Sequence, residues 1–172
     1  MHGMNIQRWS PSVTVAAIVH DNGMPRRYLL VEEHTPEGLK LNNPAGHLEP
    51  GEGPQEGVMR EALEETACRF HPTALLGVYL ARFQRPASGE DVTYVRFAYV
   101  GTASAAQAGR ALDEGIVRTL WLTLDEVRNA ATAGRLRSDL VLRCLQDAEA
   151  GIAHPLDTVI TDATLLTPEI KR

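Results

Sequence analysis

Cysteine is scarce in this sequence, since Cys68 and Cys144 are the only two among 172 residues. They lie far apart and lack the paired spacing of zinc-binding or redox motifs. Histidine gives no metal motif either, because four of these residues are scattered without ligand spacing: His2, His34, His71 and His154. We therefore expect no zinc site, and the cysteine usage favours a reducing compartment.

Long apolar runs are also missing. No stretch of 18 apolar residues occurs, and the first segment, MHGMNIQRWSPSVTV, lacks the basic and apolar regions of a secretory signal. The sequence thus predicts a cytoplasmic protein without a membrane partner.

An excess of positive charge is absent as well, because 17 basic and 22 acidic side chains give a formal net charge of −5. Nucleic-acid backbones bind basic surfaces, so we expect no nucleic-acid partner. An anionic ligand of this protein would need cationic side chains close to its own binding site.

The length fits one domain with a substantial core. Hydrophobic residues make up 44% and charged residues 23%, values that are typical of a globular protein. We expect a single domain over residues 1–172, with its core at about 10–152 and an irregular tail at 153–172. The sequence leaves the oligomeric state open between a monomer and a homodimer.

Local patterns predict an alternation of strands and helices. The β-branched apolar run SVTVAAIV at residues 12–19 is typical of a strand buried on both faces, and residues 28–33 are expected to complete a hairpin with it. The other expected elements are an antiparallel strand pair at 74–83 and 92–100, a strand at 116–122, and helices at 54–66, 124–131 and 139–150. Thr123 and Ser138 are the expected N-caps of the last two helices. This order predicts an α/β fold, a three-layer α/β/α sandwich around a mixed sheet.

Glycine and proline precede the most acidic of these helices. Gly53 as cap and Pro54 as first helical residue are suited to start a helix at residues 54–66. Val58 and Ala62 lie four residues apart, so they can face a core while the acidic side chains point elsewhere.

Three carboxylates crowd one side of this helix. Glu61 precedes Glu64 and Glu65 by three and four residues, which sets like charges side by side at a cost of roughly a few tenths of a kcal/mol per pair. A divalent cation removes that cost, and Mg²⁺ prefers carboxylate, water and phosphate oxygens as ligands. The composition alone also fits a solvated helix face, but the spacing within residues 46–68 favours metal-dependent phosphate chemistry.

The segment GHLEPGEGPQEGVMREALEETAC, residues 46–68, resembles the signature of the Nudix hydrolases. The matching positions are Gly46, Glu52, Arg60, Glu61, Ala62, Glu64 and Glu65. Two positions depart from the signature, since Ala67 replaces a glycine and Cys68 replaces an aliphatic residue. We expect the backbone at Ala67 to stay right-handed, because a left-handed alanine costs about 1–2 kcal/mol.

The resemblance implies a mixed sheet between helices and a hydrolase that uses Mg²⁺ or Mn²⁺. The metal ligands that it implies are Glu61, Glu64, Glu65 and the main-chain carbonyl of Ala45. Glu61 or Glu64 is the expected general base. Arg60 is expected to orient the carboxylates through two-pronged hydrogen bonds, with Glu52 as a partner.

Candidate substrate contacts lie outside the acidic helix. His47 belongs to the distinctive segment NNPAGHLE and could contact phosphate or, equally well, hold the loop together. Four residues of the expected strand pair and its loop could grip a base or a phosphate, or could be plain sheet surface: Phe83, Arg85, Tyr94 and Arg96. Asp113 and Glu114 could complete the acidic site, although a solvated turn explains them as well.

A wider likeness over residues 13–157, in VTVAAIVHD, LLVEE, NNPAGHLE and HPLD, is to a phosphatase branch of the same family. Members of that branch remove phosphate from nucleoside tri- and diphosphates and from a pyrimidine pyrophosphate precursor of thiamine. Our leading hypothesis is therefore phosphoanhydride hydrolysis in such small substrates. A dinucleotide pyrophosphatase acting on ADP-ribose or diadenosine compounds is an alternative. A nucleotide-sensing module without turnover is another, but it predicts lost carboxylates, and none is lost here.

Overall fold

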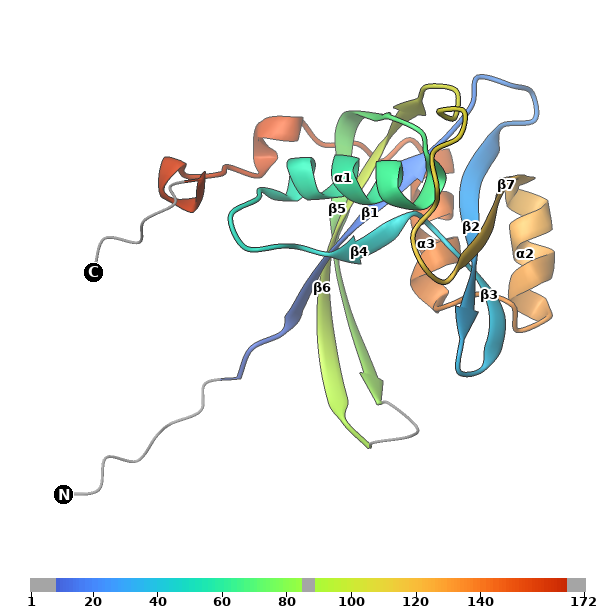
Figure 1. Ribbon diagram of the computed structural model, residues 1–172, viewed down its shortest axis with the longest axis horizontal. Coiled ribbons are helices and arrows are strands. Elements are labelled where there is room, and N and C mark those ends of the chain that lie inside the picture. The colour runs from blue at the N-terminus through green and yellow to red at the C-terminus, as the bar shows by residue number, and fades with distance from the viewer. Residues whose placement is uncertain (1–8, 85–88, 167–172) are drawn as a thin grey trace.

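Seven strands form two sheets in the computed structural model, which describes residues 9–84 and 89–166 (Figure 1). The strands of the larger sheet are β1 (Ser12–Val19), β4 (Ala45–His47), β5 (Phe70–Gln84) and β6 (Asp91–Ala103), and those of the smaller sheet are β2 (Arg27–Thr35), β3 (Gly38–Asn42) and β7 (Ile116–Thr123). The larger sheet has the order β4-β1-β6-β5 and is mixed, because β1 runs antiparallel to β4 and parallel to β6. The smaller sheet is antiparallel, with the order β3-β2-β7.

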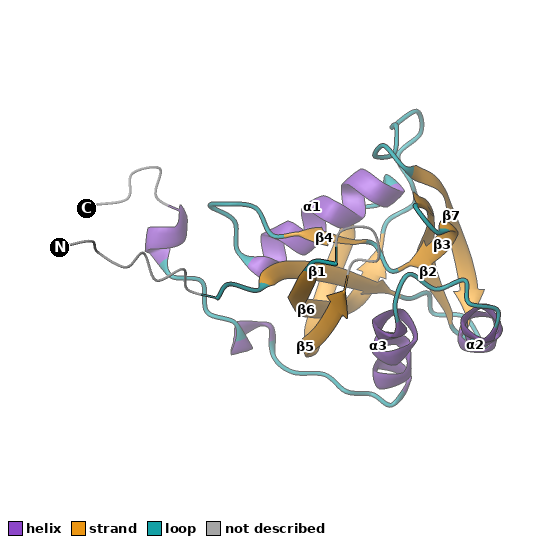
Figure 2. Ribbon diagram, turned by 90° about the horizontal axis from the view of Figure 1, so that it is seen from below, coloured by secondary structure: helices purple, strands orange, loops and turns teal. Residues whose placement is uncertain are grey.

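Helices cover both faces of the larger sheet. They are α1 (Pro54–Thr66), α2 (Leu124–Thr132) and α3 (Asp139–Glu149), followed by short 3-10 helices at Leu156–Thr158 and Ala163–Leu166. Figure 2 shows α1 on one side of β1 and β6 and α3 on the other, with α2 beside β7. The α/β class and the sandwich arrangement expected from the sequence are therefore confirmed.

The apolar run in β1 explains this layering. Its side chains alternate between the two faces of the sheet, and Val15 to Val19 are all at most 1% exposed. Val15, Ala17 and Val19 belong to the core on the side of α1, whereas Ala16 and Ile18 belong to the core on the side of α3. A strand between two helical layers needs apolar residues at every position, as this one has.

The expected hairpin of residues 12–19 and 28–33 is wrong. In the structure β1 pairs with β4 and β6, while β2 pairs with β3 and β7 in the other sheet. A single bridge between His20 and Tyr28 joins the two strands where they diverge. Both hydrogen-bonding edges of β1 are already occupied, so β2 must find its partners elsewhere.

Two short strands were not expected, because their residues look like loop. Gly38–Asn42 forms β3 through pairing with β2, and Ala45–His47 forms β4 through pairing with β1. Such short strands have little periodic signal of their own, and they exist because a long neighbour supplies their hydrogen bonds.

Helix α1 begins as expected, with Gly53 in extended conformation before Pro54. Its end differs from the expectation, because Ala67 is left-handed with φ of 58°. The Ala67 N–H donates to the Leu63 carbonyl at 3.0 Å, and the Ala67 carbonyl accepts from the Gln107 N–H at 2.9 Å. These two bonds and the burial of the side chain hold a conformation that costs alanine about 1–2 kcal/mol.

The other two helices start where the sequence places them. Thr123 forms the expected cap of α2 and completes a capping box with Glu126. Ser138 occupies the N-cap position of α3, but its side chain makes no capping hydrogen bond. Within the described residues, no helix combines the length and the apolar character needed to cross a membrane.

Candidate active site

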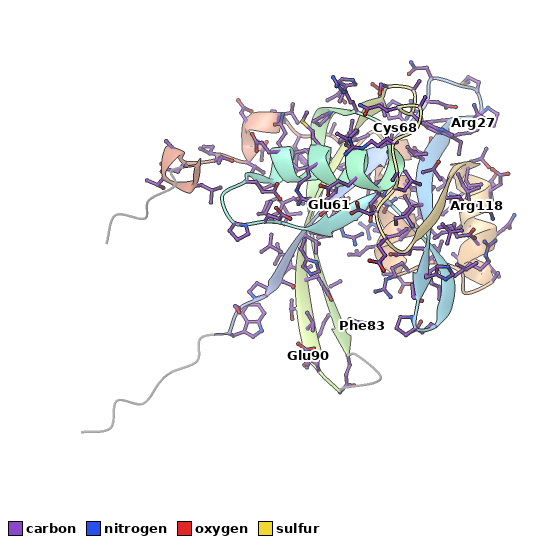
Figure 3. All side chains as sticks on the ribbon, in the orientation of Figure 1. Arg27, Glu61, Cys68, Phe83, Glu90 and Arg118 are labelled. Atoms are coloured by element: carbon purple, nitrogen blue, oxygen red, sulfur yellow. The ribbon has the colours of Figure 1, made fainter. Side chains whose placement is uncertain are left out.

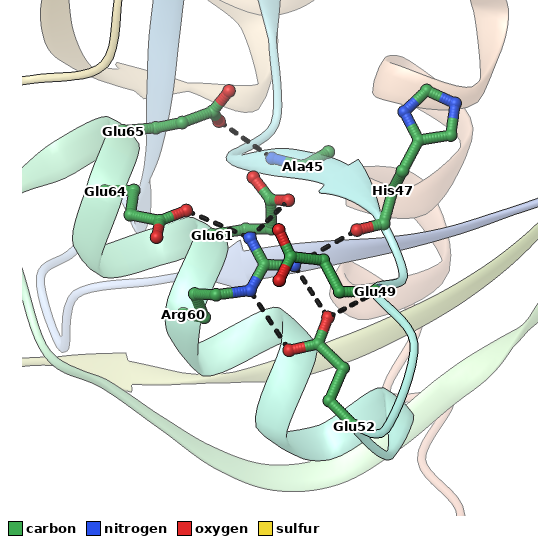
Figure 4. A network of polar contacts seen from close by, with 8 residues as sticks. All are labelled: Ala45, His47, Glu49, Glu52, Arg60, Glu61, Glu64 and Glu65. Carbon is green, nitrogen blue, oxygen red and sulfur yellow. Dashed lines mark hydrogen bonds and ion pairs between the residues drawn. The ribbon is translucent and has the colours of Figure 1, made fainter.

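Helix α1 turns its charged face toward β4, the short strand that precedes it in the chain (Figure 4). The opposite face is apolar, since Val58 and Ala62 are buried in the core. This division follows from helical spacing, which puts Arg60, Glu61, Glu64 and Glu65 within little more than one turn. Their side chains therefore meet the loop and strand that contain Ala45, His47 and Glu52 (Figure 4).

Arg60 is the centre of a polar network. Its Nε and Nη2 donate to the two carboxylate oxygens of Glu52 at 3.0 and 2.7 Å, so the expected pairing is present. Its Nη1 donates to Glu61 at 2.8 Å and to Glu64 at 2.9 Å. Its Nη2 also donates to the His47 carbonyl at 3.1 Å. The hydrogen bonding between Arg60 and Glu52 lowers the pKa of Glu52 and raises the pKa of Arg60.

Glu61 lies against β4 in a place that only glycine permits. A Cβ atom added to Gly46 would lie 2.1 Å from Oε1 of Glu61, much closer than any real contact. Glu61 is 8% exposed, and this burial raises the pKa of its carboxyl even though Arg60 is close and acts in the opposite direction. The signature glycine therefore serves to let a carboxylate approach the strand.

Glu65 is the most perturbed carboxylate of the helix. It is 9% exposed, and burial raises its pKa to about 8, against the opposing effect of a 2.9 Å hydrogen bond from the Ala45 N–H. The charges of Glu61, Glu33 and Asp113 raise the pKa further. Ala45 thus contacts the carboxylate through its amide, whereas the sequence pointed to its carbonyl as a metal ligand.

Asp113 lies beside the C-terminal end of α1. Its N–H donates to the Glu64 carbonyl at 3.1 Å, and its charge acts on both Glu61 and Glu65. Glu114, the second acidic residue of this turn, is exposed. The structure therefore brings Asp113 near the acidic site through a loop that is distant in sequence.

The acidic side chains of this site match a divalent cation in their chemistry but not in their arrangement. In the described part of the chain, no three His, Cys, Asp or Glu side chains are arranged as a metal site. Nη1 of Arg60 bridges Glu61 and Glu64, and Glu65 accepts a hydrogen bond from the Ala45 N–H. The expected convergence of the three carboxylates is thus not seen in this arrangement. The chemistry of the side chains nevertheless fits a hard cation, because the site offers carboxylate oxygens as ligands. Two of these carboxyl groups, those of Glu61 and Glu65, are buried and have a raised pKa.

The predicted substrate contacts are dispersed over the larger sheet. The ring of His47 faces that of Tyr94, with centroids 6.3 Å apart. Arg96 lies in the middle of β6, and its Nε and Nη1 are buried without a hydrogen-bond partner in the described residues. Phe83 is 45% exposed near the tip of the β5–β6 hairpin, far from Glu61 (Figure 3). Arg85 lies outside the described residues.

Sequence reasoning missed Thr14. Its hydroxyl is buried on β1, and no described residue is its hydrogen-bond partner. In the sheet register, Thr14 lies directly between His47 and Arg96. The available signal was a polar residue inside the apolar run SVTVAAIV, but its significance depends on which strands lie beside it.

Comparison with known proteins gives a consistent result. The NUDIX domain model matches residues 10–143 of this chain. Phosphatase NudJ of Escherichia coli strain K12 is 28% identical over 151 residues, which is 88% of this chain and 92% of that protein.

Solved structures agree in fold. The NUDIX hydrolase from Nitrosomonas europaea is 42% identical, with a TM-score of 0.77 over 89% of this chain and 98% of that chain. The NUDIX domain of Shewanella oneidensis NrtR, crystallised with ADP ribose, is 17% identical, with a TM-score of 0.63 over 87% of this chain and 94% of that one. At that identity the second likeness shows the fold alone.

Proposed function

Since this chain belongs to the NUDIX family and is an enzyme of its hydrolase class, we propose that it hydrolyses small nucleoside di- or triphosphates or a pyrimidine pyrophosphate. The reaction consumes one water molecule. The water oxygen forms a bond to phosphorus, and the phosphoanhydride P–O bond breaks with its electron pair going to the leaving phosphate group. One proton of the water passes to a carboxylate. The similarity to phosphatase NudJ over 88% of this chain supports this substrate class.

The charged residues of α1 have different proposed roles. Glu61, Glu64 and Glu65 would hold Mg²⁺ or Mn²⁺, with Ala45 beside them. When bound, such an ion neutralises phosphate charge and lowers the pKa of water. Glu61 and Glu64 are the two candidate bases, and each accepts a hydrogen bond from Nη1 of Arg60. Arg60 holds the side chains of Glu61 and Glu64 in position.

One observation carries this proposal. Glu65 is almost completely buried, and no cationic side chain forms a salt bridge with it among the described residues. A buried carboxylate without a counter-ion is costly, and a bound cation relieves that cost. The position of this carboxylate beside Glu61 on the signature helix favours a cation as the missing partner.

Glu65→Gln tests the assignment, because it keeps the shape of the side chain and removes its charge. We expect Mg²⁺-dependent hydrolysis of a nucleoside diphosphate to fall by about 10- to 100-fold or more. We also expect millimolar Mg²⁺ to raise the melting temperature of the wild-type protein but not of the variant. Glu56→Gln, an exposed position on the same helix, is the matched control. Hydrolysis by Glu65→Gln at the wild-type rate contradicts the proposal.

The products separate this function from its alternative. Release of orthophosphate from a nucleoside diphosphate supports the proposed phosphatase. Two mononucleotide-type fragments from ADP-ribose or a diadenosine compound would support a dinucleotide pyrophosphatase instead. A panel of both substrate types, with phosphate and pyrophosphate measured separately, gives the answer. The cytoplasmic location and the choice between monomer and homodimer remain predictions.

A further inference from the structure

A polar row crosses the larger sheet on the face toward α3. The strand register places His47, Thr14, Arg96 and Tyr79 side by side on β4, β1, β6 and β5. Residues paired in this way point to the same face of a sheet.

The next row along the strands consists of small residues. These are Ala45, Ala16, Ala98 and Gly77, of which Ala16 and Ala98 are buried in the core with α3. The polar row lies against α3 as well, because the Tyr79 hydroxyl donates to Asp147 of that helix at 2.9 Å.

Two members of this row have buried polar atoms with no hydrogen-bond partner among residues 9–84 and 89–166. They are Nε and Nη1 of Arg96 and the hydroxyl of Thr14, which occupy adjacent positions on β6 and β1. Buried polar groups in folded proteins are almost always hydrogen-bonded, and an unpaired buried charge is especially costly. Burial also lowers the pKa of Arg96. Two neighbouring side chains therefore have buried donors that are available to a ligand.

Nearby carboxylates do not supply the missing partner. Glu33 and Glu65 act on Arg96 electrostatically, but neither forms a hydrogen bond with it. Glu33 accepts a bond from the Asn42 side chain at 3.1 Å, and Glu65 accepts one from the Ala45 N–H at 2.9 Å. The guanidinium of Arg96 thus lies close enough to interact with Glu65 electrostatically, and the described part of the chain provides no acceptor for its buried Nε and Nη1.

We propose that Arg96 and Thr14 bind a second phosphoryl group of the substrate, apart from the one positioned at Glu61 and Glu65. This inference rests on the proposed function, because it assumes a substrate that reaches both places. A guanidinium presents two parallel N–H donors that match two phosphate oxygens, and a threonine hydroxyl can donate a third bond.

Binding without turnover provides the test. The probe is methylenediphosphonate, which keeps two phosphoryl groups and has no hydrolysable anhydride bond, titrated by calorimetry in the presence of Mg²⁺. We expect Arg96→Met to weaken its binding by about 10- to 100-fold, the range for loss of a charge-assisted hydrogen bond. Arg96→Lys should fall between wild type and Arg96→Met, and Thr14→Val should weaken binding less than Arg96→Met.

Arg82→Met is the matched control, since Arg82 lies on the same hairpin, is exposed and pairs with Asp91. It should bind the probe as the wild type does. In kinetics, Arg96→Met should raise KM for a nucleoside diphosphate by more than it lowers kcat. Its melting temperature without ligand should equal or exceed that of wild type, because an unpaired buried charge is removed. A variant that fails to fold leaves Arg96→Lys and Thr14→Val to decide.

Equal affinity for the probe in wild type and all three variants, or no binding by any of them, overturns the assignment. Buried water alone would then explain the unpaired atoms. A wild-type protein that binds the probe through Arg96 but hydrolyses no phosphoanhydride would refute the proposed function and leave the anion site standing. The two proposals therefore fail in different ways.

Discussion

Arg60 and Glu52 form a two-pronged ion pair, with Nε and Nη2 of the arginine donating to the two carboxylate oxygens at 3.0 and 2.7 Å. Both side chains are mostly buried, with exposures of 23% for Arg60 and 16% for Glu52. This pair fixes the guanidinium so that only Nη1 reaches Glu61 and Glu64. Glu52 therefore controls how the Arg60 guanidinium contacts Glu61 and Glu64, the two carboxylates that the proposed function assigns to a cation.

Glu52→Gln should weaken this control. The freed guanidinium would interact more strongly with Glu61 and Glu64, so we expect the apparent affinity for Mg²⁺ to fall by about 10-fold or more. This apparent affinity is measured from the rate of hydrolysis as a function of Mg²⁺ concentration. Glu49→Gln, an exposed neighbour in the same loop, should behave as wild type. An unchanged Mg²⁺ dependence in Glu52→Gln would show that the ion pair serves the fold alone.

Gly46→Ala should displace Glu61, because the added Cβ would lie 2.1 Å from its Oε1. We expect loss of most hydrolytic activity and a lower free energy of unfolding. A double-mutant cycle provides the control, since Glu61→Ala removes the atoms that clash. The destabilisation by Gly46→Ala, measured by urea denaturation, should largely disappear in the Glu61→Ala background. Equal destabilisation in both backgrounds would mean that another contact is responsible.

Ala67→Gly should stabilise the protein. The left-handed backbone at φ of 58° strains alanine and suits glycine. Relief of about 1–2 kcal/mol is offset by the greater flexibility of glycine in the unfolded chain and by loss of the buried methyl group, worth about 0.8 kcal/mol, so the net gain is at most roughly 0.5 kcal/mol. Ala133→Gly is the control, because Ala133 follows α2 with φ of −81° and should lose stability instead. Denaturation curves that show a loss for Ala67→Gly would contradict this account of the helix end.

The ion pairs of Glu32 should make the free energy of unfolding fall in acid. Hydrogen bonds from Arg118 at 2.7 Å and Arg135 at 2.8 Å lower the pKa of this carboxyl from its ordinary value of 4.5, with the Arg118 bond as the largest cause. The unfolded chain then binds more protons than the native protein, so stability rises with pH through this range. The contribution is present above about 4.5 and is lost as pH falls through the native pKa.

The measurement compares the free energy of unfolding of wild type and Glu32→Gln between pH 3 and 7. We expect their difference to be largest near neutral pH and to shrink below the ordinary pKa. Glu37→Gln is the control, because Glu37 is exposed and 3.9 Å from Lys40. A difference that does not change with pH would show that Glu32 contributes by packing and not through its charge.

Local sequence predicted helix α1 and the layers around it well. Gly53 and Pro54 start the helix through their own backbone preferences, and Val58 and Ala62 face the core because of helical spacing. The pairing of Arg60 with Glu52 could also be expected, since both belong to one short segment. By contrast, the hairpin expected from β1 and β2 was wrong, because strand pairing depends on competition among distant strands.

The sequence by itself determined the α/β class, the buried strand β1 and the acidic face of α1, because each depends on interactions between residues close in the chain. Only the tertiary structure decided that Ala67 is left-handed and that Glu65 turns to Ala45. It also decided that Nε and Nη1 of Arg96 find no hydrogen-bond partner within the described residues. These outcomes depend on which distant groups become neighbours, and neighbours set burial, hydrogen bonding and charge.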